Sequence, residues 1–357
     1  MRGLDIFSGA GGSSAGARLA GVEMVGAVDL CPVATATYQD NFPDAHVVTG
    51  RLEDVDRRAL RRAVGDIDIL LSSPECTNHS CAKGAAPRSE ESRATAMLVV
   101  EYARQFRPRW VVLENVVHMK PWSRYEELKR ELRSLGYRLA EQVLDASDYG
   151  VAQTRRRLFL VGDLCRDPGL VGRKRPGRRR STKSVLDREG IWETTPLFAE
   201  RRAAATAERA RRAIRSVGEE CPFLLVYYGS DGSGGWQPIS RPLRTITTVD
   251  RFALVRPGSD GHEMRMLQVP ELKRAMGFEG IYRFERGTRR DRVRLLGNGV
   301  CPPVMAQVVR GLTGVSADRQ LDDTGTRDVG VCVGDQMHDQ LLAHAVSNGP
   351  VLTELAW

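Results

Sequence analysis

Residues 5–12 read Asp-Ile-Phe-Ser-Gly-Ala-Gly-Gly and lie almost at the start of the chain. The apolar run at 4–7 predicts a short buried strand, and the glycines after it predict a tight turn into a helix. Such a turn lets a nucleotide-like ligand approach the backbone closely. The spacing Gly-x-Gly-Gly lacks the Gly-x-Gly-x-x-Gly pattern of dinucleotide sites, so it favours a cofactor without a pyrophosphate.

Short apolar strands alternate with amphipathic helical stretches as far as Gly162. Strands are expected at 4–7, 24–29, 67–72, 110–114, 138–145 and 157–162, with helices at 94–105 and 125–135 among the intervening stretches. This alternation predicts an α/β fold built from right-handed βαβ units. The last two strands are joined without a helix, which suggests an antiparallel hairpin at one edge of the sheet.

After Gly162 the periodicity ends and Arg, Pro, Gly and Ser become frequent, which marks a boundary. A helix at 199–217 and strands around a glycine-rich turn near 228–235 follow, and helical patterns resume from 264 to 312. Trp236 and two tyrosines near this turn either contact bases and sugars or pack a small satellite core. We expect a catalytic and cofactor-binding domain at 1–164, an inserted domain at 165–240, a return to the catalytic domain at 241–314, and a tail of unknown role at 315–357.

Composition narrows the class of protein. With 357 residues and 41% hydrophobic content the chain can bury a sizeable core. Its seven cysteines show no paired spacing and fit a reducing, cytoplasmic compartment, and no long apolar span predicts a membrane segment. The net charge of +8 is local, because 166–215 holds 15 Lys and Arg against 6 Asp and Glu. That excess is suited to nucleic-acid phosphates, although a lone charge run is usually a solvated loop.

Three residues follow predicted strands and carry the reactive chemistry. Asp29 closes the second strand, where an acidic side chain can accept hydrogen bonds from ribose hydroxyls. Cys76 lies in a loop directly after the apolar run at 67–71, at the mouth of a predicted strand. Glu114 ends the otherwise apolar strand at 110–114, which makes a plain surface role unlikely for it.

Several ordered motifs together resemble the bacterial-type cytosine carbon-5 methyltransferases of DNA. They are the glycine turn, the Cys76 loop, Val-Val-Leu-Glu-Asn-Val at 111–116, Val-Ala-Gln-Thr-Arg-Arg-Arg-Leu-Phe-Leu-Val-Gly at 151–162 and Leu-Leu-Gly-Asn-Gly-Val-Cys-Pro-Pro at 295–303. Their joint match over about 3–312 is far more specific than any one of them. The resemblance implies a Rossmann-like fold that uses S-adenosyl-L-methionine and carries a small inserted target-recognition domain.

The resemblance also implies roles for individual residues. The Cys76 thiolate would add to carbon 6 of cytosine, Glu114 would bind ring nitrogen 3, and Arg155 and Arg157, alternating on an edge strand, would steady the base and the Cys76 loop. The cofactor would be held by Phe7, Gly9, Gly11, Asp29, Leu30, Asn298 and Val300. The target base would have to be flipped out of the duplex to reach Cys76.

Two positions depart from the family pattern. Thr49-Gly-Arg-Leu52 has Arg51 where relatives carry an aspartate that reads the adenine amino group, and a guanidinium cannot accept a hydrogen bond. Either Glu53 or Asp54 substitutes, or the adenine is held differently. Glu75 precedes Cys76 where most relatives have proline, and a carboxylate turned inward would raise the pKa of the thiol.

Double-stranded DNA is the expected partner, with a cognate restriction or defence protein as a second candidate. Phosphate contact is expected from Arg173, Lys174, Arg175, Arg178, Arg179 and Arg180. No metal site is expected, because Cys76, His79 and Cys81 form one short cluster without a second ligand pair. Two alternatives stay open: an RNA cytosine methyltransferase acting on tRNA, and a catalytically silent DNA-binding paralogue.

Overall fold

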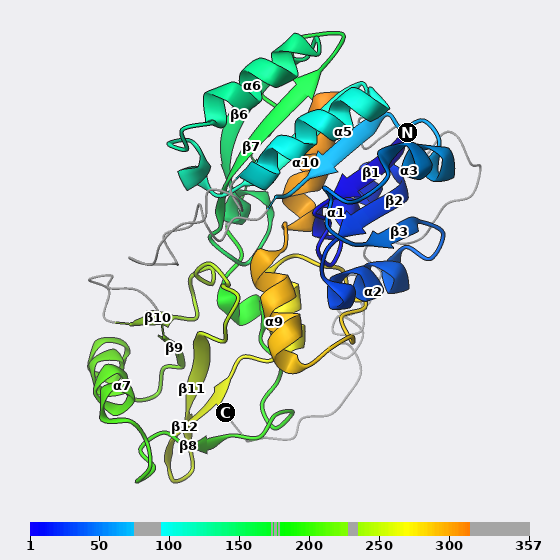
Figure 1. Cartoon of the computed structure of the whole chain (residues 1–357). Helices are drawn as coiled ribbons and strands as arrows, with labels where there is room; N and C mark the ends of the chain where they lie inside the picture. Colours follow the sequence, from blue (N-terminus) through cyan, green and yellow to red (C-terminus); the bar gives the residue numbers. More distant parts are fainter. Residues whose placement is uncertain (75–93, 173, 175–176, 178, 228–234, 315–357) are drawn as a thin grey trace, which may run out of the picture. The chain divides into compact units, whose positions relative to one another are not determined.

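The computed structural model describes residues 1–74, 94–172, 174, 177, 179–227 and 235–314 (Figure 1). Its larger sheet has seven strands in the order β3-β2-β1-β4-β5-β7-β6. Their bounds are β1 Arg2–Ile6, β2 Glu23–Asp29, β3 His46–Thr49, β4 Ile69–Ser72, β5 Trp110–Asn115, β6 Arg138–Asp145 and β7 Arg156–Asp163. Strands β3, β2, β1, β4 and β5 pair in parallel, so their carboxyl ends meet at one edge.

Helices cover both faces of this sheet. The side chains of Ile69 and Leu71 belong to one buried cluster and that of Leu70 to another, as the two-residue period of a strand requires. The first cluster takes in side chains of α1, α2 and α10, and the second those of α3, α5 and α6. These helices are α1 Gly12–Leu19, α2 Pro32–Asn41, α3 Arg57–Val64, α5 Leu98–Phe106, α6 Tyr125–Ser134 and α10 Pro302–Thr313.

The expected α/β fold is confirmed, with two differences in the strands. Sequence patterns missed β3, whose two valines are only partly buried and whose polar end residues, His46 and Thr49, are exposed. The antiparallel pairing of β6 with β7 is confirmed. However, β7 is not the edge strand, because it lies between β5 and β6 and pairs antiparallel with both.

The second sheet is antiparallel throughout and has the order β10-β9-β11-β12-β8. Its strands are β8 Thr195–Pro196, β9 Phe223–Val226, β10 Trp236–Pro238, β11 Phe252–Gly258 and β12 Gly261–Met266. Helix α7, Ala204–Val217, contacts β9 and β10, and Tyr227 and Trp236 pack against the small core between them. The strands lie on both sides of residue 240, and the domain boundary expected there stays a prediction.

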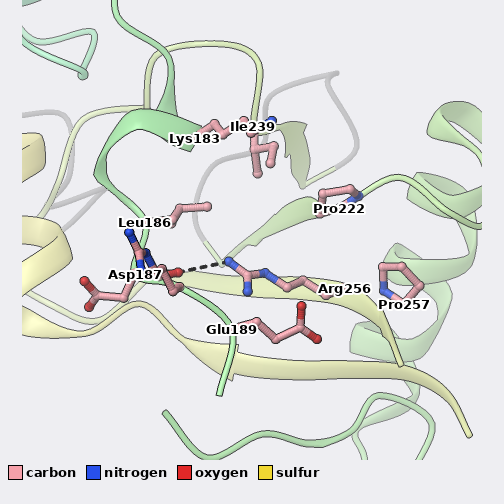
Figure 2. Close-up of a pocket in the computed structure, with 9 residues that line it drawn as sticks. Lys183, Leu186, Asp187, Glu189, Pro222, Ile239, Arg256 and Pro257 are labelled. Atoms are coloured by element: carbon pink, nitrogen blue, oxygen red, sulfur yellow. Dashed lines mark hydrogen bonds between the residues drawn. The ribbon is translucent and has the colours of Figure 1, made fainter. Parts of the chain in front are cut away.

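A cavity of about 390 Å³ opens beside the second sheet (Figure 2). Its wall carries charges of both signs, including Lys183, Arg188 and Glu189. Arg256 reaches across it from β11 and donates to the backbone carbonyl of Asp187 at 3.2 Å. This mixture of charges favours no single class of ligand.

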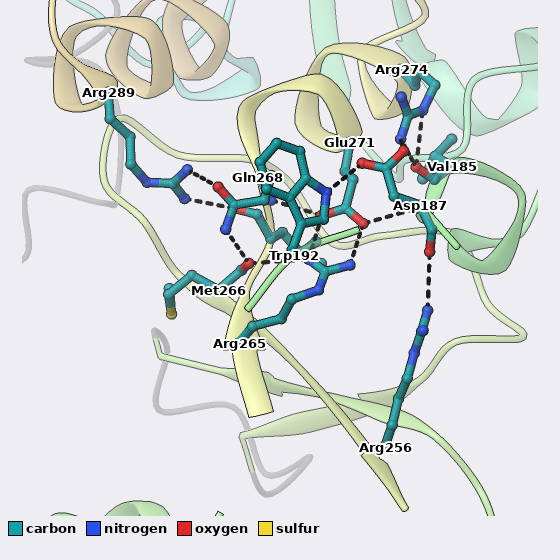
Figure 3. A network of polar contacts seen from close by, with 11 residues as sticks. Val185, Asp187, Trp192, Arg256, Arg265, Met266, Gln268, Glu271, Arg274 and Arg289 are labelled. Carbon is teal, nitrogen blue, oxygen red and sulfur yellow. Dashed lines mark hydrogen bonds and ion pairs between the residues drawn. The ribbon is translucent and has the colours of Figure 1, made fainter. Parts of the chain in front are cut away.

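A network of ion pairs joins the second sheet to α8, Val269–Ala275, and α9, Arg289–Asn298 (Figure 3). Arg265 of β12 donates to both carboxylate oxygens of Glu271 on α8, each at 2.7 Å. Arg289 of α9 binds Asp250, which lies just before β11. We call this contact between the second sheet and the two helices the joint. Glu271 is completely buried, so water cannot solvate its carboxylate, and the joint depends on the charged groups pairing with each other.

Candidate active site

A cavity of about 600 Å³ follows the carboxyl edge of the parallel strands. Its lining residues come from the segments after β3, β2, β1 and β4, then from β5 and β7, and from the end of α9. In strand order they run from Arg51, through Asp29 and Phe7, to Glu114 and Arg157. This volume lies within the range of small-molecule and cofactor sites, about 300–1,000 Å³.

The glycine turn after β1 is bent toward the cavity. Phe7 has φ 56° and Gly9 has φ 52°, and both line the cavity. The Gly9 N–H donates to the Asp29 carboxylate at 2.8 Å, which ties the turn to the end of β2. A Cβ on Gly12 would lie 2.3 Å from the carbonyl oxygen of Val300, so only glycine allows α1 to start this close to the Gly-Asn-Gly-Val segment.

Asp29 and Leu30 lie in the middle of the cavity wall. The second carboxylate oxygen of Asp29 accepts from the Cys31 N–H at 2.8 Å, so the side chain is fixed in orientation. Each carboxylate oxygen still has acceptor capacity for a hydroxyl. Leu30 is 59% exposed and lines the cavity, where it offers an apolar surface on which a planar ring can lie.

Ser8 provides a test of whether the cavity suits a polar ligand. Its hydroxyl is buried, lines the cavity and has no hydrogen-bond partner among the described residues. A buried hydroxyl without a partner is costly, and a ligand with polar atoms would satisfy it. Together with Asp29 and the exposed Leu30, this fits S-adenosyl-L-methionine, which has an amino acid end, a ribose and a purine.

Glu114 and Arg157 form the far end of the cavity. Glu114 Oε1 lies 3.2 Å from Arg157 Nε, and the carboxyl group is almost completely buried. Burial raises the pKa of Glu114, and the positive charges of Arg157 and Arg155 only partly oppose it. A buried carboxyl with a raised pKa can carry a proton to a bound ligand, as a general acid must.

Arg155 does not line the cavity, although it was expected to share a face with Arg157. It precedes the first residue of β7, so the alternation of a strand does not apply to it. Its buried guanidinium donates to the backbone carbonyls of Ile246, Gly297 and Gly299 at 2.8–3.1 Å. Arg155 therefore holds the segment that contains Asn298, while Arg156 is exposed.

The remaining expected cofactor residues divide into two groups. Asn298 and Val300 line the cavity, where the end of α9 meets the glycine turn. Gly11 is not part of the lining, since a Cβ there would point at Tyr282 and Tyr38. Its φ of 83° instead explains the glycine, because this backbone conformation strains other residues.

Cys76, like Glu75, lies outside the described residues. Pro74, the last described residue before this segment, lines the cavity. Its carbonyl accepts a hydrogen bond from the side chain of Asn115 at 3.1 Å, next to Glu114. Sequence patterns did not assign this role to Asn115, which is completely buried. The one signal in the sequence was its position next to Glu114.

The expected phosphate contacts are only partly described. Arg173, Arg175 and Arg178 lie outside the described residues. Lys174 and Arg179 both bind Asp148, at 3.1 Å and 2.6 Å. Burial works against ionisation of Asp148, but the bonds from Arg179 and Lys174 outweigh it and lower the pKa of this carboxyl. Arg180 is exposed.

Sequence patterns also missed other parts of the cavity wall. Ser13, Ser73 and Ala34 line it, and so does Arg294, one helical turn before Asn298 on α9. The spacing of four residues between Arg294 and Asn298 was a usable signal for a shared helix face. Within the described residues, no cluster of three His, Cys, Asp or Glu side chains could hold a metal ion, and no helix is long and apolar enough to cross a bilayer.

Comparison with known proteins agrees with this geometry. The family model of the C-5 cytosine-specific DNA methylases matches residues 1–313. The chain is 37% identical to the type II methyltransferase M.XorII of Xanthomonas oryzae pv. oryzae, over 87% of this chain and 83% of the relative. It is 30% identical to M.HgiDI of Herpetosiphon aurantiacus, over 69% and 80%.

A solved structure supports the fold. A DNA modification methyltransferase encoded within a prophage of E. coli matches with a TM-score of 0.64 and 18% identity, covering 88% of this chain and 99% of the other. The match covers nearly all described residues, and it agrees with the strand order and with the cavity at the carboxyl edge of the sheet. The chain belongs to the C-5 cytosine-specific DNA methylase family.

Proposed function

We propose that this DNA (cytosine-5-)-methyltransferase works through a covalent adduct between Cys76 and the target cytosine. The observation that carries the proposal is the pairing of Glu114 with Arg157 at the end of the cavity where the Cys76 segment begins at Pro74. Carbon 5 of cytosine is a weak nucleophile, so a group must first add to the ring. A thiolate can do so while a buried acid neutralises the charge that develops on the ring.

The proposed reaction consists of an addition to the ring, methyl transfer and an elimination. The Cys76 thiolate forms a bond to carbon 6, and Glu114 gives its proton to ring nitrogen 3. Carbon 5 then takes the methyl group, which S-adenosyl-L-methionine supplies when bound. Loss of the carbon 5 proton to a base and expulsion of the thiolate restore the ring, and nitrogen 3 returns its proton to Glu114. Burial raises the pKa of Glu114, which favours the protonated form that this step needs.

The substrate is cytosine in duplex DNA, and we propose that it is flipped out of the helix. Glu114 and Arg157 are 7% and 14% exposed and lie inside the cavity, out of reach of a base that stays stacked in the duplex. Flipping costs a few kcal/mol of stacking and pairing, which contacts from the second sheet and the basic run would offset. The inserted recognition domain at 165–240 is part of this proposal.

We also propose a role in restriction and modification, because the relatives found are type II methyltransferases. A cognate nuclease and a cytoplasmic location belong to the same proposal. Methylation of tRNA would use the same residues, but the family model that matches the chain is that of DNA methylases. Comparing the methylation of duplex DNA and tRNA by the purified protein separates the two substrates.

The decisive experiment is covalent trapping. The unaltered protein should form a stable adduct with duplex DNA containing 5-fluorocytosine, because fluorine on carbon 5 cannot leave as a proton does. Cys76→Ser should form no adduct yet still retain DNA in a binding assay. Cys301→Ser is a matched control, since that thiol is buried and outside the cavity lining, and it should still trap. Methylation without any adduct from the unaltered protein would contradict the mechanism.

A further inference from the structure

The two ends of the cavity differ, because different strands of the sheet supply the lining residues at each end. Glu114 and Arg157 line it from β5 and β7, and Arg51 and Glu53 line it from the segment after β3. Strand β3 is at one edge of the sheet, and β5 and β7 lie toward the other edge (Figure 1). The methyl group has to be delivered next to Glu114 if the proposed function is correct. In the cofactor the ribose separates the purine from the sulfonium, and the purine is at the opposite end from the amino acid. The purine then lies toward Arg51 and Glu53.

The segment that carries Arg51 and Glu53 is firmly held. A turn is closed by the bond from the Asp54 N–H to the Arg51 carbonyl at 3.0 Å. Leu52, between the two charged residues, is 2% exposed, and its carbonyl accepts from the Tyr102 hydroxyl at 3.2 Å. The Gly50 N–H binds the Asp29 carbonyl at 3.0 Å. Because Leu52 is fixed by burial, its neighbours Arg51 and Glu53 are held where they line the cavity.

The two charged side chains are not a tight ion pair. Arg51 and Glu53 approach to 3.9 Å, with 54% and 40% of the side chains exposed, and such pairs contribute little to stability. Side by side they present a donor and an acceptor, because a guanidinium only donates hydrogen bonds and a carboxylate only accepts them. The edge of adenine presents the complement, an amino group that donates beside a ring nitrogen that accepts.

We propose that Arg51 and Glu53 together read the purine of the cofactor. Glu53 accepts from the adenine amino group, and Arg51 donates to the ring nitrogen beside it. The pair therefore selects adenine against hypoxanthine, because the 6-oxo group of hypoxanthine would face the Glu53 carboxylate. This inference rests on the proposed use of S-adenosyl-L-methionine and adds two residues that determine the specificity for it.

Calorimetry with two unreactive ligands tests the pair. S-adenosyl-L-homocysteine has a 6-amino group beside an unprotonated ring nitrogen 1, and S-inosyl-L-homocysteine has a 6-oxo group and a hydrogen on that nitrogen. The unaltered chain should prefer the adenosyl ligand. Arg51→Ala and Glu53→Ala should each weaken its binding about tenfold, the effect of one lost charge-assisted hydrogen bond. Glu53→Ala should also bring the two ligands to within about threefold of each other, because Arg51 can then donate to the 6-oxo group.

Asp54→Asn is the matched control, because Asp54 is exposed in the same turn, does not line the cavity, and keeps its backbone bond. It should bind both ligands as the unaltered chain does. If the unaltered chain binds the adenosyl ligand and both alanine variants bind it equally well, the inference is wrong while the proposed function stands. If the unaltered chain binds neither ligand, the proposed cofactor itself is wrong.

Discussion

Asp5 and Glu271 are both completely buried carboxyl groups, but the two regions that contain them hold them differently. Asp5 is the second-last residue of β1, before the glycine turn, and accepts a hydrogen bond from the Ser14 hydroxyl at 2.6 Å. Glu271, at the joint with the second sheet, accepts two bonds from Arg265 and one from each of two backbone N–H groups. The cofactor region therefore buries a carboxyl without a cation, and the joint buries a complete ion pair.

This difference indicates how each region should respond to change. A lone buried carboxyl is most stable when it is protonated, so the region around Asp5 should depend on pH. A buried ion pair depends on both partners, because removing one leaves an unpaired charge away from water. The proposed acid Glu114 lies in the first region, and the proposed DNA contacts of the second sheet depend on the joint.

The largest expected effect comes from Glu114→Gln. Glutamine keeps the size of the side chain and can donate a hydrogen bond, but it cannot transfer a proton to ring nitrogen 3. We expect kcat to fall roughly 10²- to 10⁴-fold, the usual contribution of a positioned acid. Single-turnover methylation measures it. Affinity for S-adenosyl-L-homocysteine should not change, and Glu126→Gln, on an exposed face of α6, should leave kcat intact. A kcat within threefold of normal would remove Glu114 from the mechanism.

The next effect tests the joint. Glu271→Ala leaves Arg265 buried without its partner, and we expect the free energy of unfolding to fall by about 3–5 kcal/mol. Urea unfolding measures it. The double variant Arg265→Met with Glu271→Met should recover most of the loss, because an apolar pair of similar volume carries no unpaired charge. In native buffer DNA binding should weaken more than cofactor binding, and an equal loss of both would contradict the separation of the two regions.

The comparison also shows what the sequence could predict. Apolar runs located β1, β2, β4 and β5, because buried parallel strands are almost continuously apolar. The antiparallel strands β6 and β7 were located as well, with bounds that agree to within one residue. The same rule missed β3, where the exposed His46 and Thr49 flank only two valines, both partly buried. Motifs located Asp29, Glu114, Arg157 and Asn298 around one cavity, because residues after parallel strands converge at one edge.

Contacts between distant segments were beyond sequence patterns. The position of Arg155 depends on the carbonyls of Gly297 and Gly299, which lie more than 140 residues away. The pairing of Lys174 and Arg179 with Asp148 could not be predicted either. A count of charges along the sequence does not show which acidic side chain lies next to which basic one. Local patterns specify elements and strand ends, and tertiary packing decides which side chain reaches the cavity.

A smaller effect concerns Asp5 and pH. Burial raises the pKa of Asp5 to about 7, although the Ser14 hydrogen bond opposes this. A raised pKa means that the folded state retains a proton that the unfolded chain loses near pH 4. The stability that Asp5 contributes is therefore complete below about pH 4 and is lost as the pH rises to 7.

Asp5→Asn tests whether the stability contributed by Asp5 is lost as the pH rises. Asparagine can still accept the Ser14 hydrogen bond but never ionises. Relative to the unaltered chain it should be more stable at pH 8, by about 4 kcal/mol at most, and no more stable at pH 4. Urea unfolding at the two pH values gives the difference. Asp66→Asn, whose side chain is 87% exposed, should show no such shift. A gain for Asp5→Asn that is equal at both pH values would show that burial does not hold Asp5 protonated.

The smallest effect separates two neighbouring arginines of the basic run. Arg180 is exposed and forms no ion pair with any described residue, whereas Arg179 lies 2.6 Å from the Asp148 carboxylate. If each free cation neutralises one DNA phosphate, Arg180→Ala should reduce the slope of log K against log salt by about 0.9. Arg179→Ala should reduce it less, because Asp148 already neutralises part of its charge. Asp148→Asn should steepen the slope by releasing Arg179 and Lys174, and Arg62→Ala, an exposed change on α3, should not alter it. Equal slopes for all four variants would show that the run is a solvated loop, and DNA affinity would then depend on other parts of the chain.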